Sequence, residues 1–224
     1  MRDDSDIKRD VETELRWNSD IDATDVGVSV KQGVVTLSGF VRSYSEKFDA
    51  ERDAKRVSGV VGVANDLEVR LPSSDQRPDP DIARDAVSAV KSQLPFVADR
   101  IKVLVDHGWM TLEGEVEWNF QKERAETAVR HIRGVKGVVN QIHIKPRAPV
   151  ASEVKQKIEE ALKRRAELEA EDIKVETKGS EVILRGKVRT WTEREEAERA
   201  AWLAPGVTKV DNRISVGLLS ALAA

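Results

Sequence analysis

The 224-residue chain contains no cysteine, which excludes disulfide bonds, thiolate chemistry and cysteine-ligated metal sites. Aromatic residues make up only 4% of it, so its cores must be built from aliphatic side chains. It has no apolar run of 18 residues, so no segment is predicted to cross a bilayer. Lys and Arg nearly balance Asp and Glu, at 37 against 40, and a chain without a basic excess is not predicted to bind nucleic acid.

The first ten residues, MRDDSDIKRD, lack the apolar segment of a secretory signal. This favours a cytoplasmic protein, with the periplasm as the alternative if a signal has been removed. Charge is spread unevenly along the chain. Residues 1–71 carry 11 Lys/Arg against 15 Asp/Glu, residues 72–147 carry 12 against 11, and residues 148–224 carry 14 of each. The middle third is therefore the least acidic.

One phrase occurs three times: GVVTLSG at 33–39, GWMTLEG at 108–114 and, more loosely, SEVILRG at 180–186. After the last glycine of each phrase, a Gly-Val pair follows 20 residues later and an asparagine 26 residues later. Three coincident spacings in three copies indicate an internal repeat. The repeated positions are Gly39, Gly59 and Asn65, then Gly114, Gly134 and Asn140, then Gly186, Gly206 and Asn212.

Each copy begins with apolar residues at every fourth position, which predicts an amphipathic helix, and continues with two stretches of alternating apolar residues, which predict a hairpin. A second helical stretch and a third alternating stretch follow. We predict an α+β protein of three tandem αββαβ domains, each a three-stranded mixed sheet with two helices packed on one face. Predicted N-caps of the first helices are Ser5, Asp79 and Ser152.

The second helices should begin at capping boxes formed by Ser43 with Glu46 and Thr192 with Glu195, and at Asn119 in the middle copy. We interpret the strand glycine, Gly39 in the first copy, as the place where a helix crosses the sheet and leaves no room for a side chain. Gly59 and its counterparts are interpreted as C′ glycines that end the second helices with positive φ. The first helix of the third copy is expected to extend through LKRRAELEAE.

The predicted domain organisation follows from these repeats and from two proline-rich linkers. It assigns domain 1 to residues 1–71, a linker to 72–80, domain 2 to 81–147, a linker to 148–152, domain 3 to 153–219 and an apolar tail to 220–224. Small domains bury a limited share of their surface, so we expect the three to pack on one another or to form a homo-oligomer.

The pattern Gly-x-Val-x-Leu-x-Gly-x-Val, followed by a helix and then by Gly-Val-x4-Asn, resembles the BON domain, named for bacterial osmotically inducible and nodulation proteins. The resemblance covers nearly the whole chain as three copies, and the third departs from it where Ser180-Glu181 replaces the Gly-apolar pair. It implies an αββαβ fold and a non-enzymatic module. It also implies association with the bacterial envelope, with osmotic stress and, in some members, with anionic phospholipids.

No catalytic residue, metal site or cofactor is predicted. The three histidines, His107, His131 and His143, are scattered and have no nucleophile or acid at a spacing that would make a triad or a ligand set. The glycine-rich segments precede strands, whereas dinucleotide-binding loops follow a strand and open a helix. These features argue against an enzyme.

Aromatic residues gather after the second predicted strand of each copy, with basic residues nearby. An aromatic and basic rim could engage lipid head groups or a protein partner; the alternative is a hydrophobic staple that holds the loop on its own helix. The second predicted helix of the middle copy adds basic residues on its outward face; the alternative is that this face is simply exposed to solvent. The candidate binding residues are Tyr44, Trp118, Phe120, Lys122, Arg130, Arg133 and Trp191.

The leading hypothesis is a non-enzymatic stress-response protein that attaches to anionic phospholipid surfaces through repeated modules, where three weak sites add up by avidity. The competing hypothesis is a protein-interaction scaffold or self-associating stress-protective protein that binds no lipid. The acidic first domain favours the second hypothesis, because anionic membranes would repel it. A small-molecule sensor with a cleft between domains is a third.

Overall fold

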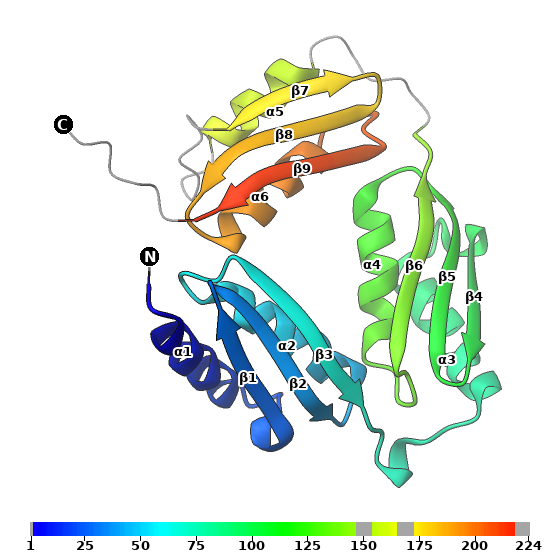
Figure 1. Ribbon diagram of the computed structural model, residues 1–224. Helices are drawn as coiled ribbons and strands as arrows, with labels where there is room; N and C mark the ends of the chain where they lie inside the picture. The colour runs from blue at the N-terminus through cyan, green and yellow to red at the C-terminus, as the bar shows by residue number, and fades with distance from the viewer. Residues whose placement is uncertain (1, 147–153, 165–172, 218–224) are drawn as a thin grey trace.

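A computed structural model of the chain describes residues 2–146, 154–164 and 173–217. It contains three units, and each unit forms a three-stranded sheet with two helices on one face (Figure 1). The fold predicted from the repeat is therefore confirmed. Ser152, the LKRRAELEAE segment beyond Arg164, the second linker and the apolar tail lie outside the described residues. The predicted domain boundaries stay predictions.

The elements follow the same order in each unit. The first unit consists of α1 (Asp4–Trp17), β1 (Val26–Lys31), β2 (Val34–Val41), α2 (Tyr44–Arg56) and β3 (Gly62–Val69). The second consists of α3 (Asp79–Gln93), β4 (Ile101–Asp106), β5 (Trp109–Val116), α4 (Asn119–Arg130) and β6 (Gly137–Ile144). The third consists of α5 (Val154–Lys163), β7 (Lys174–Lys178), β8 (Glu181–Val188), α6 (Trp191–Trp202) and β9 (Lys209–Val216).

The middle strand of each sheet pairs antiparallel with the first strand and parallel with the third. The register is the same in all units, since Gly39 lies opposite Val26 and Leu67, and Gly114 lies opposite Ile101 and Ile142. One sheet face and the two helices enclose a separate aliphatic core in each unit. The apolar residues predicted at every fourth position of the first helices are buried in these cores: Ile7, Val11 and Leu15; Ile82, Ala86 and Val90; Val154, Ile158 and Leu162.

The strand glycine has a different role from the one predicted. Its φ is +108° at Gly39 and +140° at Gly114, a region that L side chains rarely adopt. A Cβ at Gly39 would overlap the backbone carbonyl oxygen of Asp25, and one at Gly114 would overlap that of Arg100. The chain entering the first strand, and not a crossing helix, therefore excludes the side chain.

The repeated asparagine ties the third strand to the second helix. In domain 1 the Asn65 side-chain amide donates to the Lys47 carbonyl at 3.0 Å and to Glu51 at 3.2 Å, while its oxygen accepts from the Leu67 N–H at 3.3 Å. Asn140 and Asn212 make the same three hydrogen bonds, at 3.0 to 3.2 Å. Each asparagine satisfies backbone groups on two elements at once, which explains its fixed spacing.

The first helices begin earlier than predicted. Asp3, and not Ser5, caps α1, and Asp79 is the first residue of α3 instead of its N-cap. The Asp4 and Asp79 carboxylates instead accept two backbone N–H groups each from the hairpin turns, at 2.7 to 3.0 Å. These turns carry positive φ at both central residues in the first two domains, which makes their N–H groups available.

The second helices also differ at their ends. Ser43 caps α2 as predicted by accepting the Glu46 N–H, and the Glu46 carboxylate accepts the N–H of Arg42, one residue before the cap. In α6 the same contacts are made by Thr190 and Glu193, so the predicted Thr192 box is wrong. Asn119 is the first residue of α4, where the Gln121 side chain caps the chain by accepting two backbone N–H groups. Gly59 has the predicted positive φ of +93°, but α2 ends at Arg56, so this glycine lies beyond the C′ position.

Replacing Gly39 with valine should lower the free energy of unfolding of domain 1 by about 3 kcal/mol, because it adds steric overlap with Asp25 to an unfavourable positive φ. Urea denaturation followed by circular dichroism measures the change. Gly62→Ala is the matched control, since a Cβ there would meet Val34 at an ordinary 3.7 Å. Equal stabilities of the two variants would contradict this account.

Candidate functional site

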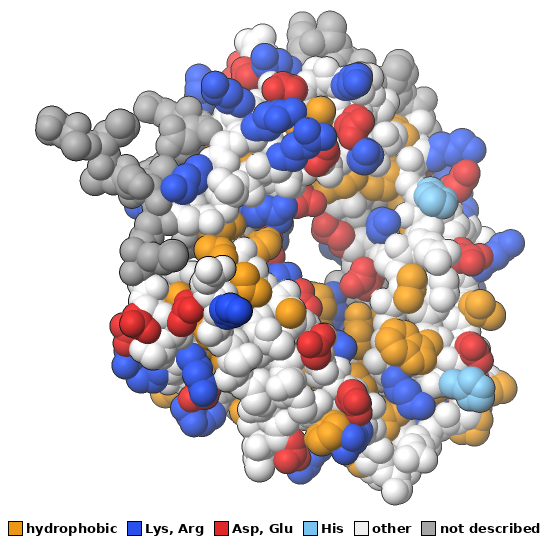
Figure 2. All heavy atoms as spheres, viewed as in Figure 1, with side chains coloured by type: hydrophobic (Ala, Val, Ile, Leu, Met, Phe, Trp, Pro, Cys, Tyr) orange, Lys and Arg blue, Asp and Glu red, His pale blue; other side chains and the backbone are white. Residues whose placement is uncertain are grey.

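The second helices of the three domains face one another around the centre of the molecule, and a central opening is visible between the domains (Figures 1 and 2). A cavity of about 500 Å³ there is lined by residues of α2, α4 and α6. Its charged lining mixes signs, with basic residues Lys55, Arg130, Arg194 and Arg199 and acidic residues Glu123, Glu126, Glu195 and Glu198. The domains therefore meet through a repeated contact between second helices.

At the junction of domains 1 and 2, the start of α2 contacts the end of α4. Tyr44 packs against the core of domain 2, and the Arg130 guanidinium lies 3.3 Å from the centroid of the Phe48 ring. Burial raises the pKa of Tyr44, and the Glu126 carboxylate raises it further, while Arg130 and a backbone hydrogen bond at Val138 oppose the shift. This junction is held by packing and by a cation–π contact.

At the junction of domains 3 and 1, the start of α6 contacts the end of α2. Trp191 packs against the core of domain 1, and the Lys55 ammonium lies 5.6 Å from the centroid of its ring. Arg194 of the same helix lies 5.0 Å from that centroid. Trp191 takes the helix position that Tyr44 takes in domain 1, because both are the first residue after the N-cap.

At the junction of domains 2 and 3, the corresponding surfaces enclose a pocket of about 280 Å³. Trp118 and Phe120 line it from the start of α4, and Trp202 and Leu203 line it from the end of α6. These surfaces remain open to solvent, since Trp118 is 37% exposed and Phe120 49%. The three domains thus form a closed circle with three junctions. An aromatic side chain fills two of these junctions, and none fills the third.

The predicted binding residues thus divide into groups. Tyr44 and Trp191 pack against neighbouring domains, a contact that the sequence did not predict. Trp118 and Phe120 flank the open junction. Arg130 was predicted to point outward, but it packs on Phe48 with a 13% exposed side chain and pairs with Glu126 at 3.6 Å. Lys122 is half-buried, and only Arg133 of the basic set is exposed.

A second surface was missed by the sequence analysis. On the outer face of the β4–β5–β6 sheet, opposite the helices, Leu104 is 60% exposed, Trp109 55% and Val139 43%. Leu104 and Val139 lie on either side of Thr111 in the register, and the Trp109 ring lies over Gly137. Figure 2 shows hydrophobic side chains gathered on this face. We call Leu104, Trp109 and Val139 the outer apolar patch.

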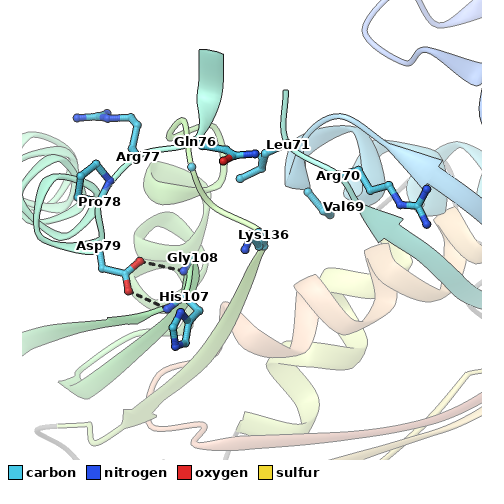
Figure 3. A pocket seen from close by; sticks show the side chains of 11 residues that line it. Val69, Arg70, Leu71, Gln76, Arg77, Pro78, Asp79, His107, Gly108 and Lys136 are labelled. Carbon is cyan, nitrogen blue, oxygen red and sulfur yellow. Dashed lines mark hydrogen bonds between the residues drawn. The ribbon is translucent and has the colours of Figure 1, made fainter. Parts of the chain in front are cut away.

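A further pocket, of about 600 Å³, lies where β3 and the linker meet the β4–β5 turn (Figure 3). Asp79 holds the turn by accepting the N–H groups of His107 and Gly108. Arg70 and Arg77 point away from Lys136 in the pocket, toward their own carboxylate partners Glu68 and Asp85. The basic residues therefore do not converge on one anion site.

Within the described part of the chain, no cluster of three or more His, Cys, Asp or Glu side chains is arranged to hold a metal ion. None of the helices that the structure describes is long and apolar enough to span a bilayer.

The repeat, the αββαβ unit and the asparagine hydrogen bonds between third strand and second helix define a protein of three tandem small α+β domains. The family model described as "BON domain" matches residues 3–70, 79–146 and 151–217, so the chain belongs to the BON domain family, as the resemblance indicated. The chain is similar to osmotically-inducible protein Y of Escherichia coli (strain K12), with 34% identity over 149 residues, which cover 64% of this chain and 73% of that protein.

Solved structures of CdsD, a structural protein of the type III secretion system of Chlamydia trachomatis, are also similar in part. One is 16% identical, covers 95% of this chain and 92% of its own, and has a TM-score of 0.26. The other, the C-terminal domain, is 15% identical, covers 97% and 100%, and has a TM-score of 0.27. Scores this low say nothing about the arrangement or the partners of the present chain.

The junction of domains 1 and 2 should open at alkaline pH. The pKa of Tyr44 is raised in the folded chain, so its neutral form stabilises the junction fully below the unfolded pKa of about 10, and the contribution is lost as pH rises through the folded value. Small-angle scattering should show expansion in that range. Tyr44→Phe should resist it, and the same expansion in both proteins would contradict the assignment.

Proposed function

We propose that this chain is a non-catalytic binding protein of the osmotic stress response, which attaches to anionic phospholipid surfaces through the outer apolar patch of domain 2. Membership of the BON family and the similarity to osmotically-inducible protein Y support the stress-response part. The exposed patch carries the attachment part, because a contiguous apolar surface with a tryptophan is unusual on a soluble face.

The patch belongs to domain 2 alone. At the positions of Leu104, Trp109 and Val139, the first domain has Ser29, Val34 and Ala64, and the third has Glu176, Glu181 and Asp211. In the third domain these acids pair with Arg185, Lys209 and Arg213 at 3.3, 2.7 and 2.6 Å. Ion pairs are typical of a sheet face that stays in water, whereas exposed apolar side chains are typical of a face that binds another surface.

Basic groups lie at the turn end of the patch. Arg133 precedes β6 and is exposed, and Lys136 adjoins Gly137, over which the Trp109 ring lies. The exposed Asp106 lies opposite Trp109 in the register and adds one acidic side chain. Domain 2 is also the least acidic third of the chain. An exposed tryptophan at the same end of the domain as basic side chains is suited to the boundary between lipid head groups and acyl chains. This arrangement favours an anionic membrane surface over a purely apolar partner.

Membrane attachment then rests on one site, on domain 2, in place of three weak sites on equivalent rims. Tyr44 and Trp191 are used between domains, so they do not contribute to avidity on a membrane. A second copy of the chain or another protein covering the same patch is the competing function, and it predicts association without lipid.

Trp109→Glu should reduce co-sedimentation with phosphatidylcholine vesicles containing phosphatidylglycerol by about tenfold, because it removes the ring that the membrane would bury and adds a charge that anionic lipid repels. Arg133→Glu should reduce it more at low than at physiological salt. Vesicles of phosphatidylcholine alone serve as the lipid control. Trp17→Glu is the matched control variant, since Trp17 is 85% exposed on domain 1.

Failure of the wild-type chain to pellet with anionic vesicles at low salt would overturn the membrane proposal. Analytical ultracentrifugation of the same samples then decides the alternative. Concentration-dependent association that Trp109→Glu abolishes would indicate that the patch binds a second copy.

A further inference from the structure

The first residue of the second helix marks a position that differs among the three junctions. It is Tyr44 in domain 1, Asn119 in domain 2 and Trp191 in domain 3. Tyr44 and Trp191 both place their rings against the core of the next domain. Each of these rings therefore fills the space between two second helices.

Asn119 does not reach across its junction. The residue is 9% exposed, and its side-chain amide donates to the Glu123 carboxylate at 2.7 Å, along its own helix. A short side chain held in this way leaves the space in front of α6 unfilled. The pocket of about 280 Å³ lies at this place, between Asn119 with its neighbours and the end of α6.

The pocket walls are aromatic and aliphatic. Trp118, Phe120, Trp202 and Leu203 contribute most of the lining, and Leu203 is 63% exposed. Near the end of the second helix, the residue that faces the neighbouring domain's aromatic side chain is Lys55 in domain 1 and Arg130 in domain 2. The equivalent residue in domain 3 is Trp202. The junction of domains 2 and 3 thus has an additional aromatic side chain at the end of α6 and lacks one at the first residue of α4.

The polar groups at the rim already have partners. Arg199 pairs with Glu196 at 2.7 Å, Trp202 Nε1 donates to Glu198 at 3.4 Å, and Glu123 accepts from Asn119. A charged ligand would have to displace one of these contacts and lose its own hydration. An uncharged ring would instead stack on the tryptophan and phenylalanine faces at little cost.

We propose that this pocket binds a small uncharged aromatic molecule, a single ring system of about the size of indole, in the place that Tyr44 and Trp191 occupy at the other two junctions. The volume of about 280 Å³ lies just below the range of ligand pockets, about 300 to 1,000 Å³, which suits one small ring system and nothing larger. The bound ring completes the third junction and so stiffens the contact between domains 2 and 3.

Two-dimensional NMR of the 15N-labelled chain tests this proposal with indole as the probe. The chain has five tryptophans, and each gives one indole N–H resonance. Indole should shift the resonances of Trp118 and Trp202 in a saturable way and leave those of Trp17 and Trp109 in place. Para-cresol should act like indole, whereas cyclohexanol, a ring of similar size without π electrons, should not.

Asn119→Tyr restores the side chain found in domain 1 and adds no indole resonance, so it should fill the pocket and weaken indole binding by at least about tenfold. Phe120→Ser is the second variant, because Phe120 is half-exposed and its loss leaves the core intact; it should weaken binding as well. Phe96→Ser, at a side chain that is 96% exposed elsewhere in domain 2, is the matched control and should bind as the wild type does.

The proposal is overturned if indole leaves the Trp118 and Trp202 resonances unchanged, if cyclohexanol shifts them equally, or if a folded Asn119→Tyr or Phe120→Ser variant binds indole as the wild type does. The test is independent of the membrane site. Trp109→Glu should keep indole binding while it loses vesicle binding, and Asn119→Tyr should do the reverse.

Discussion

The contact between the start of one second helix and the end of the next is the constraint on which the arrangement of the domains depends. The contact joins two different surfaces, the start of one second helix and the end of another. Each domain carries both surfaces, so three such contacts arrange the three domains in a closed circle. The second helices, α2, α4 and α6, are thereby turned toward the centre of the molecule (Figure 1). Aromatic rings secure two of the contacts through Tyr44 and Trp191.

The sequence was sufficient for the fold of each domain. Helical stripes such as Ile7, Val11 and Leu15 and the alternating strands reflect burial against one face, which is a local and periodic property. The strand glycine was recognised but misinterpreted, since the group that excludes its side chain is the carbonyl of Asp25, on another segment. Spacing revealed that Asn65 mattered, but its partners on α2 could only be seen in three dimensions.

The candidate sites were less predictable, for a physical reason. Aromatic residues stood out because they are scarce, but the orientation of one domain on another leaves no periodic signature, so the role of Tyr44 and Trp191 between domains was not foreseen. The outer apolar patch did have a signal. Leu104 and Val139 lie at outward positions of their strands, and comparison with Ser29 and Ala64 in the first copy would have shown them as unusual.

The junction of domains 3 and 1 has one property that the other two lack: no linker crosses it. Trp191 and Lys55 hold together parts of the chain that are far apart in sequence, and the indole Nε1 is buried there without a hydrogen-bond partner among the described residues. Because both partners belong to one molecule, the contact forms at a high effective concentration and is insensitive to dilution. A modest attraction is enough to keep domains 3 and 1 in contact, and the opening of this junction follows first-order kinetics.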